Sequence, residues 1–204
     1  MGFYESRILP KLLNCCMSMG VIAEERARLV PRAHGKVLEI GIGSGLNLPH
    51  YGPGVESVTG VDPSVELGEM AARQASLVAF PVHFEQISGE SLPFGDASFD
   101  CAVITWTLCT IPDPSAALRE VRRVLKPGAE LFFVEHGHAP DPGVVVWQNR
   151  LNKVWPAIAG GCNLNRKMDQ IITAAGFRID ELEASYRPGL RPMTYFYMGV
   201  ARPA

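Results

Sequence analysis

A strand that runs into a turn of alternating glycines can hold a small ligand against the backbone. Residues 37–45 (VLEIGIGSG) have this pattern, and the glycines are Gly41, Gly43 and Gly45. Glycine reaches backbone angles closed to other residues and has no side chain, so a cofactor can lie directly against the turn. A helix that starts there adds free backbone N–H groups. Taken alone, the three glycines also fit a tight turn between a strand and a helix.

Two acidic residues accompany the glycine turn. Glu39 precedes it, and Asp62 closes a second apolar strand at residues 58–61. A carboxylate at the end of this second strand can accept two hydrogen bonds from a ribose diol. Dinucleotide phosphates need their third glycine one position later than Gly45, where this chain has Leu46. The combination predicts a nucleoside cofactor and favours S-adenosylmethionine over NAD.

Length, charge and cysteine usage narrow the class of protein. The chain has 204 residues and no Ser-rich, Gly-rich or charged linker, so we expect a single α/β domain. A net charge of −2 gives no reason to expect a nucleic-acid partner. Five cysteines without a CxxC pair indicate free thiols in a reducing compartment, and we expect the cytoplasm. No apolar run approaches the roughly 20 residues of a membrane span, and no export signal is evident.

Strand-like and helix-like segments alternate along the chain. After residues 58–61, strands are predicted at 82–87, 99–105, 131–135 and 195–200. Helical spacing predicts one or two helices within 8–29, one over about 63–76, and one around 118–125 that ends at 126–128 (KPG). This alternation is typical of a parallel, right-handedly wound sheet with its ligand crevice at the carboxyl ends of the strands. We therefore expect this edge to carry Asp62, Glu90, Thr107 and His136.

Three separated segments resemble class I S-adenosylmethionine-dependent methyltransferases. They are residues 38–45 (LEIGIGSG), 91–100 (SLPFGDASFD) and 118–128 (LREVRRVLKPG), in the order found in that class. The resemblance implies a Rossmann-like, doubly wound, mainly parallel seven-stranded α/β sheet with helices on both faces. It also implies S-adenosylmethionine as cofactor and S-adenosylhomocysteine as product.

A narrower resemblance extends beyond those segments. Residues 107–109 (TLC), 134–136 (VEH), 161–166 (GCNLNR) and 191–192 (RP) are similar to the methyltransferase-like seven group of thiol methyltransferases. That group is known for membrane-associated animal enzymes that methylate alkyl thiols. This chain lacks their hydrophobic amino-terminal anchor, so it is more like a soluble bacterial relative, and integral membrane association is not expected to carry over.

The class resemblance implies roles around the glycine turn. Glu39 would organise the turn and the methionine amino group, while Gly41, Gly43 and Gly45 would let the cofactor approach the backbone. Asp62 would bind the ribose hydroxyls. The residues expected to flank the adenine are Pro63 and Ser64.

The resemblance also implies contacts at the ends of later strands. The class often has an acidic residue where this chain has Ser88, so the adenine amino group would be bound by Ser88 and by the backbone of Gly89 and Glu90. Thr105 and Trp106 would lie beside the methionine part and the transferring methyl.

Methyl transfer from a sulfonium needs little acid–base catalysis. The leaving thioether is neutral, and holding the nucleophile in line can contribute about 7–11 kcal/mol. A thiol has a pKa of about 8.5, so a modest base suffices, whereas an aliphatic alcohol needs much more. Because no strong base is evident in the sequence, a thiol sulfur is the leading acceptor.

His136 is the predicted catalytic base, since it follows the strand at 131–135 and titrates near neutrality. A capping hydrogen bond is its structural alternative. His138 would share its side if the strand continues. Two ligands do not complete a metal site, so we expect no metal.

Four residues are assigned to the acceptor side. Cys109 and Cys162 are interpreted as thiols that shape the substrate wall rather than as nucleophiles. Trp147 lies in an apolar segment that suits a lipid-like acceptor, although a core position is equally ordinary for it. Arg166 could hold an anionic group, or it could make an ordered structural contact in the first turn of a helix that Asn165 caps.

The expected organisation has four parts: an N-terminal helical lid at 1–34, a cofactor-binding core at 35–137, a substrate cover at 138–164, and a C-terminal helix and strands at 165–204. Packing on the sheet edge is the alternative role for the lid, and peripheral contact with a membrane surface and the oligomeric state stay open. The predicted function is methyl transfer to a small apolar acceptor. The alternatives are O- or N-methylation of a quinone, phenol or phospholipid head group, and a regulator that binds S-adenosylmethionine without catalysis.

Overall fold

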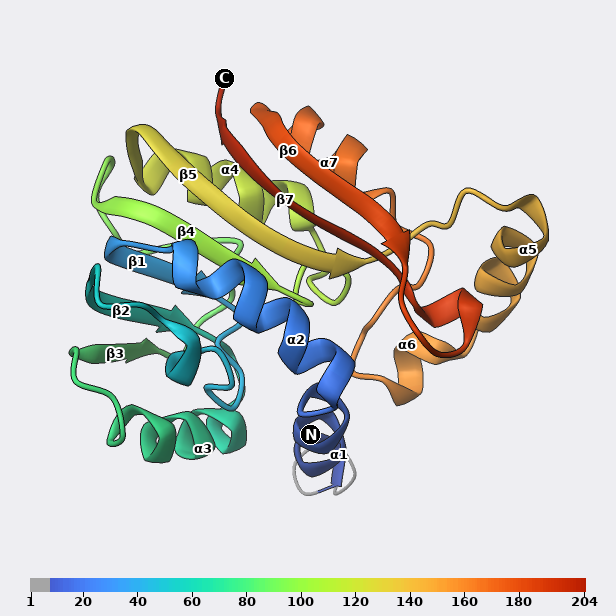
Figure 1. Ribbon diagram of the computed structural model, residues 1–204, viewed down its shortest axis with the longest axis horizontal. Helices are drawn as coiled ribbons and strands as arrows, with labels where there is room; N and C mark the ends of the chain where they lie inside the picture. The colour runs from blue at the N-terminus through green and yellow to red at the C-terminus, as the bar shows by residue number, and fades with distance from the viewer. Residues whose placement is uncertain (1–7) are drawn as a thin grey trace.

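A seven-stranded sheet lies at the centre of the computed structural model, which describes residues 8–204 (Figure 1). The strands run in the order β3-β2-β1-β4-β5-β7-β6. They are β1 (Gly35–Ile40), β2 (Val55–Val61), β3 (Val82–Glu85), β4 (Phe99–Thr105), β5 (Leu125–His136), β6 (Phe177–Tyr186) and β7 (Tyr195–Pro203). Pairing is parallel from β3 through β5, whereas β7 is antiparallel to both β5 and β6. The predicted Rossmann-like, mainly parallel α/β sheet is confirmed.

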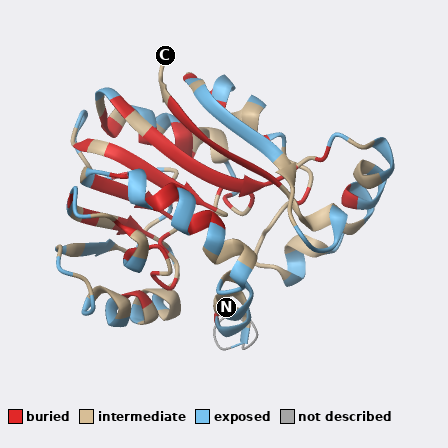
Figure 2. Ribbon diagram, in the orientation of Figure 1, coloured by how far each residue is buried: buried red, intermediate tan, exposed pale blue. Residues whose placement is uncertain are grey.

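Helices cover both faces of this sheet. They are α1 (Leu9–Met17), α2 (Gly20–Leu29), α3 (Val65–Ala75), α4 (Pro114–Val124), α5 (Pro142–Leu151), α6 (Trp155–Ile158) and α7 (Met168–Ala174). Successive strand residues face opposite sides, so Phe132 of β5 joins Leu29 of α2 in one core. Its neighbour Phe133 joins Leu118 of α4 and Ile172 of α7 in the other core. The central strands are buried along most of their length because both faces are covered (Figure 2).

The strand order places the expected ligand crevice between β1 and β4. The chain winds outward from β1 through β2 to β3, then returns to the other side of β1 as β4 and β5. Parallel strands end at a common edge, and the reversal of direction leaves an opening there. Gly41, Asp62, Trp106 and Gly137 directly follow the ends of β1, β2, β4 and β5.

Two helix boundaries differ from the sequence-based expectation. Helix α4 ends at Val124, and the KPG segment at residues 126–128 lies within β5, where the register with β4 shifts and Gly128 has a φ of 78°. Helix α7 begins at Met168, so Asn165 does not cap it and Lys167 occupies the N-cap position. For the KPG segment, pairing with β4 outweighs the tendency of its proline and glycine to end a helix. No helix within residues 8–204 is long and apolar enough to cross a membrane.

Candidate active site

The glycine turn after β1 has one open position. Gly41, Gly43 and Gly45 all have positive φ, at 73°, 55° and 80°. A Cβ at Gly41 would collide with the side chain of Thr107, and one at Gly45 would lie 3.0 Å from the backbone of Ala71. A Cβ at Gly43 would meet only a carbonyl oxygen at 3.8 Å. Two glycines therefore allow close packing of the turn, and Gly43 is where a ligand can approach the backbone.

Asp62 joins the end of β2 to this turn. Its Oδ2 accepts a hydrogen bond from the Gly43 N–H at 3.0 Å, and its Oδ1 accepts one from the Ser64 N–H at 2.9 Å. Burial raises the pKa of Asp62, and these two backbone donors lower it in part. Each carboxylate oxygen has a second lone pair, so the oriented group can still accept hydrogen bonds from a ribose diol.

Glu39 is fully buried beneath the turn and belongs to a polar network. Its carboxyl group accepts hydrogen bonds from Asn47 Nδ2 at 2.8 Å and from the Tyr51 hydroxyl at 2.7 Å. Asn47 also donates to Thr105 Oγ1 at 3.0 Å and accepts from Arg26 Nε at 2.9 Å. Burial raises the pKa of Glu39 to about 7, although Tyr51, Asn47 and Arg26 oppose that rise. The network links β1, β4 and α2 beside the crevice.

Trp106 is strained at the end of β4. Its φ is 49°, a conformation uncommon outside glycine, and its buried indole Nε1 has no hydrogen-bond partner in the described part of the chain. The Arg26 guanidinium lies 4.9 Å from the ring centre, and Phe196 contacts the ring edge-on. Residues held in such conformations cluster at ligand sites. Trp106 and Thr105 thus lie at the carboxyl end of β4, the edge where the sequence predicts the ligand crevice.

Several of the residues expected to contact the adenine have polar partners within the protein. Pro63 is exposed, and the Ser64 hydroxyl caps α3 by accepting from the Leu67 N–H at 3.3 Å. Ser88 donates to Glu90 Oε2 at 2.7 Å, and the other oxygen of Glu90 accepts from the backbone of residue 113 at 2.7 Å. Gly89 is buried between them against β1. The Ser88 and Glu90 side chains therefore bind each other.

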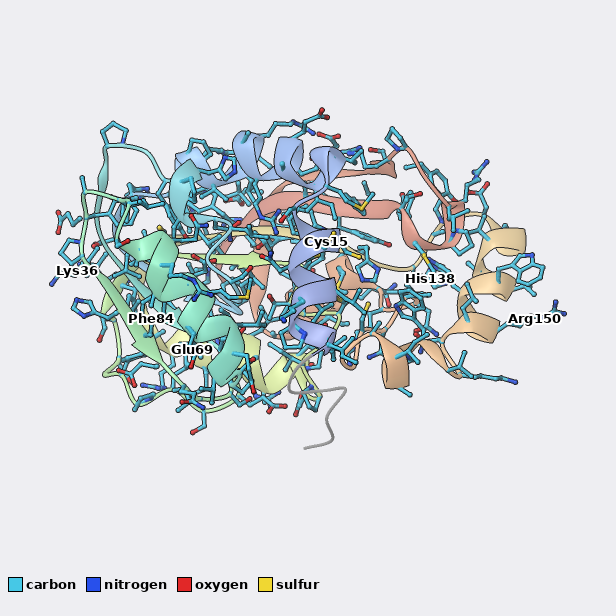
Figure 3. The ribbon with its side chains drawn as sticks, turned by 90° about the horizontal axis from the view of Figure 1, so that it is seen from below. Cys15, Lys36, Glu69, Phe84, His138 and Arg150 are labelled. Atoms are coloured by element: carbon cyan, nitrogen blue, oxygen red, sulfur yellow. The ribbon has the colours of Figure 1, made fainter. Side chains whose placement is uncertain are left out.

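Helix α1 crosses the open edge of the sheet. Figure 3 shows it in the middle of this edge, with Cys15 labelled, between α3 and the α5–α6 segment. Ser44 of the glycine turn donates to Asn14 Oδ1 at 2.7 Å, and Arg26 donates to the carbonyl of Met17 at 2.6 Å. Leu9 lies next to Gly160 in the cover segment. The helix thus contacts both the cofactor turn and the cover.

Beyond Trp106, three side chains from distant parts of the chain meet at the same edge. Cys109 follows β4, His136 ends β5, and Cys162 follows α6. His136 Nε2 lies 3.1 Å from Cys162 Sγ, and the sulfur and nitrogen atoms of all three residues are within 4.8 Å of one another. His136 and Cys109 are buried, and His136 Nδ1 has no hydrogen-bond partner among residues 8–204. The three residues form the thiol–imidazole cluster.

The residues of the thiol–imidazole cluster shift one another's pKa values. The hydrogen bond between the two thiols raises the pKa of Cys109, and burial raises it further. The same bond lowers the pKa of Cys162, and the hydrogen bond with His136 adds to that shift. Burial lowers the pKa of His136, but its contacts with Cys162 and the charge of Glu135 outweigh burial, and the net shift is upward. Of the two thiols, Cys162 is therefore the more acidic.

Glu135 fixes the loop that carries Cys109. Its buried carboxyl group accepts hydrogen bonds from the backbone N–H groups of Thr107, Leu108 and Cys109, at 2.7, 2.8 and 3.3 Å. Burial raises the pKa of Glu135 to about 7, against these three donors. Sequence reasoning gave Glu135 no separate role, because its partners are backbone groups that no residue pattern reveals.

The carbonyl groups of the same loop are bound from the other side. Asn163 donates from its backbone N–H and its side chain to the Cys109 carbonyl, at 2.8 and 3.1 Å. Arg166 donates to the carbonyls of Leu108 and Ile111. Arg166 therefore makes the ordered structural contact that was one of its two predicted roles.

The remaining predicted residues lie farther from the cluster. Trp147 is 56% exposed on α5 and stacks under the Arg150 guanidinium at 5.3 Å. Trp155, at the start of α6, is closer, since it contributes to the low pKa of Cys162. His138 does not belong to the cluster, and its backbone N–H binds the Arg166 carbonyl at 2.8 Å. The side chain that meets His136 is thus Cys162, and His138, which was expected to share its side only if the strand continued, does not meet it.

Sequence reasoning also missed the polar partners of Glu39. Arg26, Asn47 and Tyr51 lie outside the motifs that carry the family resemblance. Their side chains converge only when α2 and the turn after β1 are packed on the sheet. Tyr51 and Asn47 follow the glycine turn within ten residues, and this proximity is the one signal that could have indicated them.

Comparisons with known proteins agree with this geometry. A family model described as a methyltransferase domain matches residues 38–133. Thiol S-methyltransferase TMT1B of Rattus norvegicus is 34% identical over 158 residues, which cover 72% of this chain and 62% of that protein. Thiol S-methyltransferase TMT1A of Homo sapiens is 31% identical over 176 residues, which cover 82% of this chain and 71% of that protein. The chain thus spans less than two thirds of the rat relative.

A solved structure supports the same fold. The SAM-dependent methyltransferase from Methanosarcina mazei superposes with a TM-score of 0.62 at 27% identity, over 81% of this chain and 91% of that one. The YcgJ protein from Bacillus subtilis superposes with a TM-score of 0.64 at 21% identity, over 89% and 94% of the two chains. The second likeness concerns the fold alone.

Proposed function

This chain belongs to the class I S-adenosylmethionine-dependent methyltransferases, close to the thiol S-methyltransferase group, and we propose that it methylates the sulfur of a small apolar thiol. The observation that carries the proposal is the thiol–imidazole cluster at the carboxyl edge, beside the turn that is open at Gly43. The identity to thiol S-methyltransferases supports the same acceptor.

The cofactor is held, in this proposal, by residues that the fold already orients. Asp62 binds the ribose hydroxyls with the lone pairs left free by Gly43 and Ser64. Glu39 acts through Asn47, which it positions beside Thr105. The cofactor lies against the backbone at Gly43, and Gly41 and Gly45 support this position by letting the turn pack closely. The remaining proposed contacts are Pro63, Ser88, Gly89, Glu90, Thr105 and Trp106.

The chain's own residues position the acceptor and remove its proton. S-adenosylmethionine, when bound, supplies a methyl group on a positively charged sulfur whose leaving group is neutral. The acceptor must therefore become a thiolate and be held in line. We assign the first task to His136, the buried imidazole at the end of β5, and the shape of the wall to Cys109 and Cys162. Trp147 and Arg166 complete the proposed acceptor side.

A panel of acceptors tests the proposed function. The purified chain is incubated with methyl-labelled S-adenosylmethionine and an alkyl thiol, a phenol, a quinol, or phosphatidylethanolamine vesicles, and the labelled atom is identified in each product. We expect the label on thiol sulfur at the highest rate. Preferred labelling of oxygen or nitrogen would replace the thiol assignment. Tight S-adenosylhomocysteine binding without turnover on any acceptor would indicate a regulator instead.

A further inference from the structure

The thiol–imidazole cluster has the donor set of a soft metal site. Among the described residues it is the one group of three His, Cys, Asp or Glu side chains whose ligand atoms all lie within 4.8 Å of one another. Thiolate sulfur and imidazole nitrogen are the ligands that Zn²⁺ takes most often. Three protein ligands with a fourth position open are typical of catalytic rather than structural zinc.

The spacing of the ligand atoms suits a tetrahedral ion. Zn²⁺ binds thiolate at about 2.3 Å and imidazole nitrogen at about 2.0 Å, so its ligand atoms lie about 3.5–3.8 Å apart. The Nε2–Sγ separation of 3.1 Å between His136 and Cys162 is slightly shorter, and the other two separations are at most 4.8 Å. Shifts of less than an ångström would bring all three atoms onto one ion.

The backbone around the ligands is already fixed. Asn163, next to Cys162, donates its backbone N–H to the Cys109 carbonyl at 2.8 Å, which ties the two cysteines together. The Cys109 N–H is bound on its other side by Glu135. Hydrogen bonds that hold ligand-bearing segments in place are typical of metal sites. The cluster is therefore held together without an ion and can accept one without refolding.

We propose that Cys109, His136 and Cys162 bind Zn²⁺ and that the acceptor thiol occupies the fourth position as a thiolate. The inference rests on the proposed thiol acceptor and specifies how that thiol is activated: His136 acts as a ligand, and the ion, rather than a free imidazole nitrogen, lowers the pKa of the bound thiol. The acceptor S–H bond breaks as its sulfur binds the ion, and the proton passes to solvent. The bound sulfur then forms a bond to the methyl carbon while the carbon–sulfonium bond breaks, so no electron donor or acceptor is required.

Cobalt binding tests the site itself. Cys15 and Cys16 are exposed on α1 and would bind metal nonspecifically, so the experiment uses the Cys15→Ser/Cys16→Ser protein after removal of metals with a chelator. Titration with Co²⁺ is expected to produce thiolate-to-cobalt charge-transfer absorption and tetrahedral d–d bands that saturate at one ion per chain. Competition with a chromophoric chelator then gives the Zn²⁺ affinity. Absence of these bands would overturn the site.

Variants of the proposed ligands distinguish a specific metal site from nonspecific metal binding. Cys162→Ser, at a half-buried position, should abolish the charge-transfer absorption and weaken Zn²⁺ binding at least 100-fold. Calorimetric binding of S-adenosylhomocysteine with unchanged affinity would show that this variant is folded. His136→Gln should likewise lose the tetrahedral d–d bands. Unchanged bands in either variant would overturn the ligand assignment.

The catalytic role is tested separately from the site. Adding an alkyl thiol to the cobalt-loaded protein should shift the charge-transfer absorption, and removing the metal should lower thiol methylation at least 10-fold, with recovery on Zn²⁺ addition. Unchanged methylation by metal-free protein would overturn the metal proposal and leave the proposed function intact. Metal binding at the cluster without thiol methylation in either form would overturn the proposed function and the fourth-ligand role, while the metal site would stand.

Discussion

The cofactor side and the acceptor side of the same sheet edge are built differently. On the cofactor side, Asp62 reaches back to Gly43, and Glu39 binds Asn47 and Tyr51, so the contacts join neighbouring parts of the chain. On the acceptor side, His136 and Cys162 are 26 residues apart and meet only because β5 and the cover segment pack together. The cofactor-side contacts named here lie within residues 39–62, whereas the acceptor-side contact depends on the packing of two separate parts of the fold.

This contrast predicts that the two sides can be damaged independently. Variants of the acceptor side should lower turnover and leave S-adenosylhomocysteine binding intact. Variants of the cofactor side should weaken cofactor binding to the same extent whichever acceptor is used.

The largest effect is expected from His136→Asn. It removes the imidazole assigned to thiolate formation, so kcat for an alkyl thiol should fall roughly 10²–10⁴-fold. Initial rates with labelled S-adenosylmethionine give kcat, and calorimetry with S-adenosylhomocysteine serves as the control for folding and cofactor binding. Wild-type turnover in this variant would remove His136 from the active site.

Glu135→Gln should reduce stability on the acceptor side. The carboxyl group accepts three backbone hydrogen bonds in a buried position. An amide oxygen can keep the bonds from Thr107 and Leu108, but the NH₂ group then faces the Cys109 N–H and leaves it without an acceptor. The free energy of unfolding should fall by about 3 kcal/mol. Urea denaturation measures this loss. A change below about 1 kcal/mol would mean that Glu135 does not hold the Cys109 loop.

Glu39→Gln tests the pH dependence of the cofactor side. Burial raises the pKa of Glu39 from 4.5 to about 7, so between these values the unfolded chain ionises this group while the folded chain keeps its proton. The stability contributed by Glu39 is therefore full below pH 4.5, falls as pH rises toward 7, and stays at its lowest above 7.

The glutamine variant has no such titration. Its stability relative to the wild type should improve by up to about 3 kcal/mol between pH 4.5 and 8, and most of the change should occur below pH 7. Urea denaturation of both proteins across this range measures the difference, in which groups common to both cancel. Parallel stability curves would show that Glu39 has an ordinary pKa.

Asp62→Ala should weaken S-adenosylhomocysteine binding by about 1.5–3 kcal/mol, because hydrogen bonds to a charged group are lost. Its turnover at saturating cofactor should change much less than that of His136→Asn. Asp62→Asn is the matched control, since it keeps one acceptor oxygen and should show an intermediate loss. Unchanged affinity in the alanine variant would exclude Asp62 from ribose binding.

The sequence was sufficient to predict the strands of the sheet and the glycine turn. Apolar runs at residues 58–61 and 99–105 match β2 and β4 because buried parallel strands need continuous apolar segments. The positive φ of Gly43 follows from the same local pattern. Hydrophobic periodicity and glycine spacing are local properties of the sequence, so they can be recognised without knowing the fold.

The acceptor side was only partly predictable, for a physical reason. Cys109 and Cys162 were each assigned to the substrate wall, but their meeting with His136 depends on hydrogen bonds between loops, such as Asn163 to the Cys109 carbonyl. His138 lies beyond the end of β5, and its backbone N–H binds the Arg166 carbonyl before α7. Distances between loops are set by packing, which no residue pattern along one segment records.

The smallest predicted effect lies where the two sides meet, at α1. Asn14 accepts the hydrogen bond of Ser44 from the cofactor turn, while Leu9 of the same helix packs near Gly160 of the cover. Asn14→Ala removes one half-buried neutral hydrogen bond, so closure of α1 should weaken by about 0.5–1.5 kcal/mol. Amide hydrogen exchange should accelerate in α1 and in the glycine turn, and exchange in β4 and β5 should not change. Lys11→Ala, on the exposed side of α1, is the control and should leave all of these rates unchanged. If exchange in the turn were unaffected, α1 would be packed on the edge without restraining the cofactor site, and its assignment as a lid over both sides would be wrong.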